Sequence, residues 1–245
     1  MAHLVALNPA AYPFHITGLL LIDSPYHIAR SKITRPVAEP QRGVLPDLVR
    51  TAFAHCHAML QHWDLPRWRA EGDSGDVRDG SPRKFSVSGG QAFALRPGEV
   101  LYKPATGGAR TWSTVQTKTS DGESPSEAEV AQAETKAAAQ SSSSSSSAPA
   151  PGHPPPAVLI RCTKSARPSP DSPPDVPCLV DLHRSERLLG WEGRYADFIR
   201  AVIDVDADHY GLFDRTDMQR MEDLTARVGW GLDILDGLSR GIGKT

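Results

Sequence analysis

The sequence has little of several features by which classes of protein are recognised. Its 245 residues include only three cysteines, Cys56, Cys162 and Cys178, which are odd in number and widely spaced. They therefore make neither a disulfide framework nor a zinc site. No apolar run approaches the ~18–20 residues that cross a bilayer, and the first residues lack the basic region of a secretory signal. These absences predict a protein of a reducing compartment, the cytoplasm.

Charge of one sign is also lacking. The chain has 27 basic and 29 acidic residues, a formal net charge of −2. This balance excludes a polybasic nucleic-acid binder and an acidic tail, so we expect neither nucleic acid nor a membrane as a partner. The hydrophobic share is 39%, and 20 glycines and 21 prolines indicate that part of the length is not core.

One long stretch is low in complexity. Residues 113–156 are rich in serine, threonine, alanine and proline, and seven consecutive serines occupy 141–147. Such a segment buries too little apolar surface to offset the entropy of ordering it. We therefore predict a long disordered insertion over 113–156.

Short apolar runs and two helical patterns flank this stretch. The runs Gly18 to Asp23, Ala157 to Cys162 and Phe198 to Val205 are typical of strands buried on both faces of a parallel sheet. Apolar residues at helical spacing predict helices over Leu45 to Trp63 and Met218 to Leu238. Strands mixed with helices indicate an α/β chain.

Two candidate catalytic residues follow predicted strands. Asp23 comes directly after the first apolar run, and His209 follows the third within DVDADHY. Functional groups of parallel sheets gather at the carboxyl ends of the strands. An acid after one strand and a histidine after the last are the second and third members of the Ser, acid, His order of an α/β-hydrolase triad. We therefore expect the Asp23 and His209 side chains to meet.

At this point the sequence resembles a known family. The segments LLLIDSP, LIRC, LGWE, DFI and ADHY are similar to the thioesterase domain that ends many fungal polyketide synthases and related megasynthases. The resemblance runs from Gly18 to about Asp236, with an unmatched insertion from Trp112 to Pro156. It implies a partial α/β-hydrolase fold: an incomplete parallel sheet with a helical lid. The expected division of the partial thioesterase domain, 1–245, is a lid region over 36–112, the insertion over 113–156, and the last strands, histidine loop and final helix over 157–240.

The resemblance also implies a chemistry. Asp23 is the triad acid and His209 the base, and the substrate is a polyketide or peptide acyl chain held as a thioester on the phosphopantetheine arm of an acyl carrier protein. The protein itself needs no cofactor. Four large side chains of the predicted lid, Phe53, Met59, Trp63 and Trp68, are candidates for lining an acyl channel, and ordinary lid packing explains them equally well.

The triad nucleophile is not in its expected place. A helix, two loops and a strand separate a nucleophile elbow from the acid, roughly 20–30 residues. Only 22 residues precede Asp23, and none is serine. FSVSGG resembles an elbow around Ser88 but follows the acid in the chain, and Cys56 is interpreted as a small core residue. We therefore expect the G-x-S-x-G motif to be absent and predict a fragment that lacks the nucleophile elbow and is inactive on its own.

Metal binding is not expected. Asp204, Asp206 and Asp208 alternate like the start of a calcium loop, but His209 stands where that loop requires glycine. Histidines crowd one predicted helix without an acid or cysteine to complete a ligand set. Either of the first two aspartates could support His209 or be solvated, and Trp191 could support the histidine loop or contact substrate.

Three functions therefore stay open. The first is a thioesterase that hydrolyses carrier-bound acyl chains or releases them by cyclisation. The second is a catalytically inactive remnant, an acyl-binding interaction module of the same fold. The third is a general serine esterase.

Overall fold

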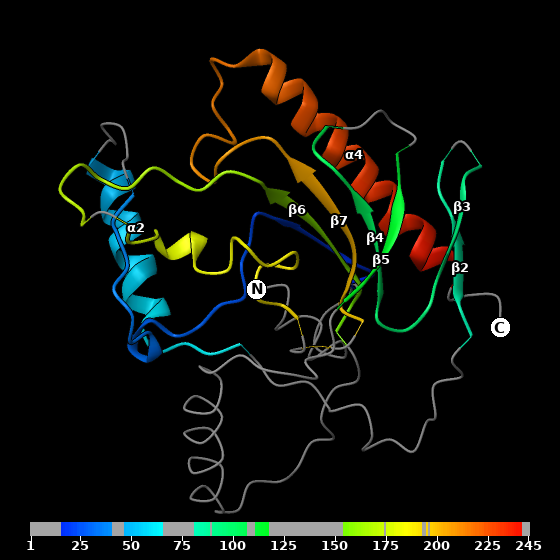
Figure 1. Cartoon of the computed structure of the whole chain (residues 1–245), viewed down its shortest axis with the longest axis horizontal. Helices are drawn as coiled ribbons and strands as arrows, with labels where there is room; N and C mark the ends of the chain where they lie inside the picture. The colour runs from blue at the N-terminus through cyan, green and yellow to red at the C-terminus, as the bar shows by residue number, and fades with distance from the viewer. Residues whose placement is uncertain are drawn as a thin grey trace, which may run out of the picture.

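The protein is built around a five-stranded, mostly parallel sheet with a long helix along one face (Figure 1). The computed structural model describes residues 16–40, 47–65, 81–88, 90–106, 111–117, 154–173, 175–192, 195 and 197–241. The strands are β1 (Leu19–Ile22), β2 (Arg83–Ser86), β3 (Ala92–Leu95), β4 (Glu99–Lys103), β5 (Ser113–Gln116), β6 (Ala157–Cys162) and β7 (Ile199–Val205). The helices are η2 (Arg30–Lys32), α2 (Asp47–Leu60), η3 (Leu179–Asp181) and α4 (Met218–Gly241).

The main sheet has the strand order β1-β6-β7-β4-β5. Strands β1, β6, β7 and β4 are parallel, and β5 pairs antiparallel with β4. The three apolar runs of the sequence form β1, β6 and β7, side by side in the sheet. The α/β class is thereby confirmed, and the carboxyl ends of four strands share one edge.

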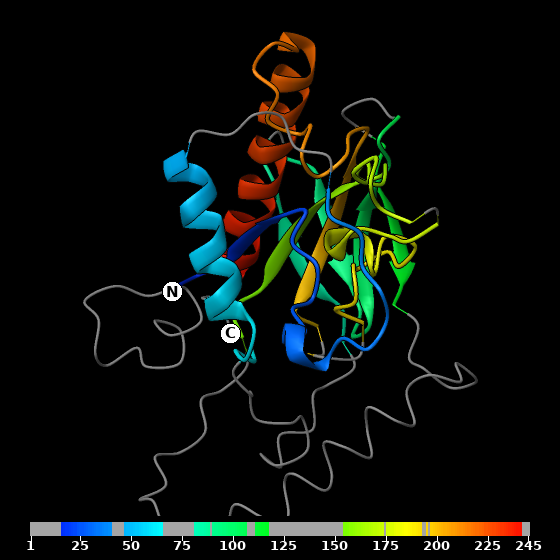
Figure 2. The same ribbon diagram turned by 90° about the vertical axis from the view of Figure 1, so that its left-hand side faces the viewer.

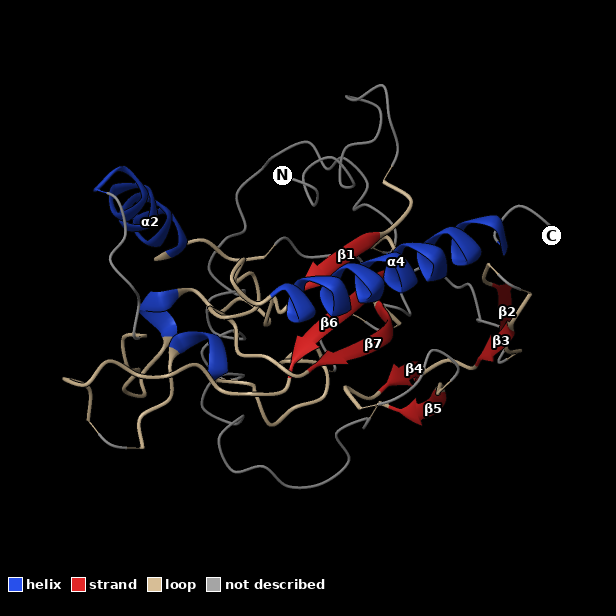
Figure 3. Cartoon of the chain, turned by 90° about the horizontal axis from the view of Figure 1, so that it is seen from above, coloured by secondary structure: helices blue, strands red, loops and turns tan. Residues whose placement is uncertain are grey.

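Each face of the sheet has its own apolar core. Alternate residues of β6 and β7, among them Ile160 and Ile203, pack with Leu224, Ile234 and Leu238 of α4. On the opposite face, a loop cluster that includes Leu189 and Trp191 covers β6 and β7. Figure 3 shows α4 lying over β1, β6 and β7. Burial on both faces explains why β6 and β7 are largely apolar.

The sheet extends further than the sequence analysis predicted. Strand β4 lies within the predicted lid region, 36–112, yet it pairs with β7 in the main sheet. Strand β5 takes residues 113–116 from the predicted disordered insertion, 113–156, and pairs with β4. Both boundaries are corrected on these strands, because the backbone groups of 99–103 and 113–116 bond to the sheet. Residues 118–153 of the predicted insertion lie outside the described residues.

Helix α2 stands apart from the sheet (Figures 1 and 2). Every described side chain from 51 to 60 is exposed. Cys56 is among them, so its interpretation as a core residue is wrong. The helix repeats apolar residues at the expected spacing, and Met59 and Leu60 of that stripe are exposed.

Two glycines of α4 provide a matched test of how tightly the helix packs. A Cβ on Gly237 would lie 2.4 Å from the backbone oxygen of Ser86, whereas a Cβ on Gly229 would meet no atom within 4 Å. We expect Gly237→Ala to lower the free energy of unfolding by about 1–3 kcal/mol, because the helix must move off β2. Gly229→Ala should raise it by up to about 1 kcal/mol through helix propensity. Urea unfolding of the two variants measures both; equal effects would contradict this packing.

Candidate active site

A buried carboxylate follows β1 directly, at the carboxyl ends of the parallel strands. Asp23 is 1% exposed and adopts a left-handed φ of 42°. Aspartate tolerates this conformation better than most residues, and it turns the chain sharply out of the strand. The backbone N–H of Cys162, at the end of β6, donates to Oδ1 of Asp23 at 2.8 Å. The neighbouring strand therefore fixes the carboxylate.

The loop after β7 brings His209 to this carboxylate. Nδ1 of His209 lies 2.9 Å from Oδ2 of Asp23, across 186 residues of sequence. The loop is held by Asp208, whose Oδ1 accepts the backbone N–H groups of Tyr210 and Gly211. The His209 side chain is 30% exposed, and the Tyr210 ring packs edge-on against it at 4.9 Å. The predicted meeting of Asp23 and His209 is confirmed.

A third charged residue completes the cluster. Arg184 donates from Nη1 to Oδ1 of Asp23 at 2.6 Å and from Nη2 to Oδ2 at 2.8 Å. Its Nε donates to Oδ1 of Asp181 at 2.9 Å. Neither Arg184 nor Asp181 was predicted from the sequence. No local signal marks them, because Arg184 stands 161 residues from the acid that it binds.

The cluster keeps the acid ionised. Burial alone would raise the pKa of Asp23, but the hydrogen bonds from His209 and Arg184, together with the Arg184 charge, outweigh it and lower the pKa to about 2. Burial raises the pKa of the adjacent Cys162 thiol, which leaves that cysteine an inert thiol rather than a nucleophile.

Trp191 supports the acid loop. Its Nε1 donates to the backbone oxygen of Ser24 at 2.9 Å. The indole is 5% exposed and packs against the rings of Tyr26, Tyr195 and Phe198. The sequence left open support of the histidine loop or contact with substrate, and the contacts of Trp191 are instead to the loop that follows Asp23.

The alternating aspartates before His209 diverge. Asp204 is buried and hydrogen-bonds to Arg161 and Tyr102. Asp206 is exposed and pairs with Lys164. Among the described residues no cluster of three potential ligands could hold a metal ion.

The four candidate acyl-channel residues have different outcomes. Met59 is 67% exposed and Trp63 is 44% exposed. Nε2 of His27, in the loop that follows Asp23, hydrogen-bonds to the backbone oxygen of Trp63 at 2.8 Å. The Phe53 side chain and all of Trp68 lie outside the described residues.

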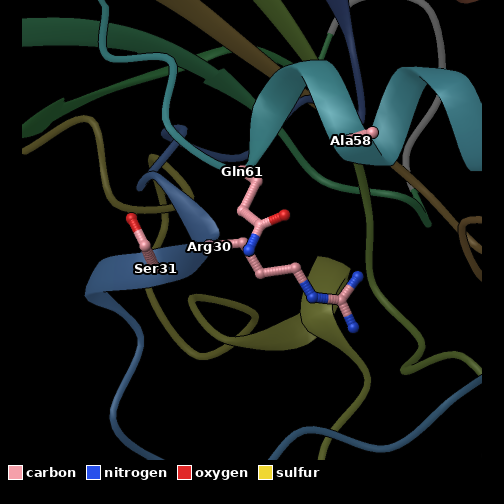
Figure 4. Close-up of a pocket in the computed structure, with 4 residues that line it drawn as sticks. All are labelled: Arg30, Ser31, Ala58 and Gln61. Carbon is pink, nitrogen blue, oxygen red and sulfur yellow. The ribbon is translucent and has the colours of Figure 1, made fainter.

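A hollow of about 390 Å³ lies beside the end of α2 and is lined by Arg30, Ser31, Ala58 and Gln61. Figure 4 shows Gln61 reaching from α2 toward Arg30. The Arg30 guanidinium also pairs with Glu39. Neither Asp23 nor His209 lines this hollow.

The expected absence of a G-x-S-x-G pattern needs a correction. The five letters do occur, from Gly237 to Gly241, and place Ser239 at their centre. These residues form the last turns of α4 rather than a strand-to-helix turn. Nearby Leu235 packs against Gly18. Gly18 lies just before β1, at the end of the strand opposite to Asp23. Ser239 is therefore no elbow for His209.

Ser88 is not a nucleophile elbow either. Strands β2 and β3 form an antiparallel pair around it, and both its backbone N–H and its hydroxyl donate to Asp233 of α4. Within the described part of the chain, the Nε2 atom of His209 has no hydrogen-bond partner.

The depressed pKa of Asp23 predicts a sensitivity to acid. Its folded pKa of about 2 lies below the ordinary pKa of 3.8 for an aspartate, so the stability that it contributes is present above pH 4 and is lost as the pH falls toward 2. The loss amounts to about 2 kcal/mol. Asp23→Asn should remove this part of the pH dependence from urea unfolding curves, and the exposed control Asp206→Asn should not. Parallel pH profiles for the unchanged chain and Asp23→Asn would contradict the assignment.

The chain is similar in sequence to fungal proteins named as thioesterases. The chain is 32% identical over 223 residues to the "Probable thioesterase KK1J" of Curvularia clavata, a match that covers 91% of this chain and 61% of that protein. It is 35% identical over 240 residues to the "Probable thioesterase lcsE" of Purpureocillium lilacinum, covering 96% of this chain and 64% of the other. This chain is homologous to these fungal proteins.

A third match, to the "Thioesterase frbD" of a Dothideomycetidae species, is 34% identical over 84 residues, which are 34% of this chain and 32% of that protein. The chain thus spans about three fifths of the length of the first two relatives.

No protein-family model and no solved structure matches it significantly. Of the described helices, none combines the length and apolar character that a bilayer crossing requires.

Proposed function

We propose that this chain is the acid-and-base part of a thioesterase that releases polyketide or peptide acyl chains from the phosphopantetheine arm of an acyl carrier protein. The observation that carries the proposal is the hydrogen bond between His209 and Asp23 at the carboxyl edge of a parallel sheet. The homology to proteins named thioesterases supports the reaction class. The acyl chain and the carrier follow from the resemblance to fungal megasynthase domains.

His209 is the general base of this proposal. Its Nδ1–H donates to Asp23, which leaves the Nε2 lone pair to accept the proton of a nucleophile. The nucleophile attacks the thioester carbonyl, and the imidazolium returns the proton to the leaving thiolate. The second step repeats the proton transfer with water, or with a hydroxyl of the acyl chain when the product is cyclised. Asp23 holds the tautomer and stabilises the imidazolium.

The nucleophile is proposed to be the serine of a G-x-S-x-G turn on a strand beside β1. Among the described strands β1 pairs only with β6, so its outer edge can accept another parallel strand. A strand there would end on the same edge as β1 and place its turn near Asp23, as in a partial α/β-hydrolase fold completed by further residues.

Hydrolysis of carrier-bound substrates tests the proposal. Two forms are compared: the 245-residue chain, and a version with an added amino-terminal strand, G-x-S-x-G turn and helix. Each receives the same acyl group on a phosphopantetheinylated carrier protein, on a small thiol and as an oxygen ester. We expect turnover only by the extended form, fastest with the carrier thioester, with acyl label trapped on the added serine.

The other outcomes separate the alternatives. Acyl label on a residue of the unextended chain would make that residue the nucleophile. Equal rates with the oxygen ester and the carrier thioester would indicate a general serine esterase. Acyl binding by both forms without turnover by either would favour the second candidate, an inactive acyl-binding module. That candidate is consistent with the His209 side chain, whose Nε2 atom contacts no nucleophile among the described residues.

A further inference from the structure

The Arg184 side chain binds Asp23, the acid of the proposed triad. It is 9% exposed, and four hydrogen bonds of 2.6–2.9 Å hold it: two to the Asp23 carboxylate, one to Asp181 and one to the backbone oxygen of Cys162. Asp181 is itself buried and accepts the backbone N–H of Ala166. The guanidinium is therefore fixed by groups of the folded core.

These bonds leave the Asp23 carboxylate no freedom to turn. Oδ1 accepts from the Cys162 N–H and from Nη1 of Arg184. Oδ2 accepts from Nη2 of Arg184 and faces Nδ1 of His209. A planar, two-pronged donor is the geometry that holds a carboxylate in one orientation. The orientation held here directs one oxygen at the imidazole.

Arg184 also affects the charge that His209 meets. An isolated aspartate favours the imidazolium form of a histidine, whereas a permanent guanidinium charge on the same carboxylate opposes it. Asp181 partly compensates on the far side of the guanidinium. The other groups near His209 are the neutral Cys162 thiol, Asp208 and Tyr210 of its own loop, Asp206 paired with Lys164, and Arg220, which donates to the backbone oxygen of Gly211.

We infer that Arg184 is a positioning residue that aims Asp23 at His209 and shares the carboxylate charge that the imidazole meets. The consequence for turnover rests on the proposed function. The geometric and electrostatic consequence does not, and it can be measured on the 245-residue chain without substrate.

The test follows the His209 imidazole by NMR as the pH is changed. We expect Arg184→Gln, which removes the charge, to raise the midpoint of the His209 titration by about one pH unit relative to the unchanged chain. Arg184→Lys keeps the charge and should move the midpoint by less than half as much. Lys164→Gln removes a neighbouring exposed charge and should leave it in place.

A folded Arg184→Gln variant with an unmoved midpoint would overturn the inference, as would an equal shift in Arg184→Lys. If the glutamine variant does not fold, Arg184→Gln with Asp181→Asn removes one buried charge of each sign, and the midpoint should still rise because the guanidinium is the nearer of the two. Absence of turnover in the extended form, with the shift observed, would reject the proposed function and leave the role of Arg184 standing.

Discussion

Replacing Asp23 with asparagine is expected to lower kcat for hydrolysis of the carrier thioester by about 10⁴-fold in the extended form that turns over. The amide NH₂ cannot accept a hydrogen from Nδ1, and the amide oxygen carries no charge with which to stabilise the imidazolium. KM should change much less, because Asp23 is buried behind His209. Steady-state kinetics with the phosphopantetheinylated carrier protein provide the measurement.

The double variant tests whether the two residues act as one unit. His209→Ala alone should abolish most of the activity, and adding Asp23→Asn should reduce it little further, because members of a triad are not additive. The exposed Asp206→Asn serves as the control and should retain full activity. Additive losses from the two substitutions would show that Asp23 acts on turnover by a route other than His209.

Replacing Arg184 with leucine should have the second largest effect, this time on stability. It leaves the Asp23 and Asp181 carboxylates, both buried, without their shared cation. Breaking a buried ion pair in this way costs about 3–5 kcal/mol. Urea unfolding near neutral pH measures the loss.

Lys164→Leu is the matched control for this loss. Lys164 pairs with Asp206 through side chains that are 57% and 63% exposed, and surface pairs contribute about 0–1 kcal/mol. A similar loss from the two substitutions would mean that the Arg184 cluster is hydrated and adds little to the fold.

Strands β1, β6 and β7 of the main sheet were predicted from the sequence. Strands β6 and β7 are buried on both faces and β1 is half-buried, so each is a short, largely apolar run. Asp23 and His209 were found for the same reason, since each follows one of these runs directly. Their meeting follows from parallel pairing, which brings strand ends together at one edge.

Strands β4 and β5 could not be predicted in the same way. Strand β4 reads EVLYK, and its Lys103 is fully buried. That burial depends on the Trp112 and Trp230 rings, whose centres lie 5.0 and 4.5 Å from the ammonium nitrogen. Nothing in the local sequence indicates that two indoles from other elements will cover a lysine.

By itself, then, the sequence determined three strands of the main sheet, the α/β class, and the two residues that follow those strands. Those properties depend on periodicity and on neighbours within a few residues. Only the tertiary structure decided that β4 and β5 extend the sheet, that Ser239 ends a helix at the opposite edge from Asp23, and that Arg184 shares the carboxylate with His209. The pairing of β4 with β7 and the contact of Arg184 with Asp23 join residues a hundred or more positions apart, and β5 joins the sheet only through β4; such contacts are made when the chain folds, and no local pattern encodes them.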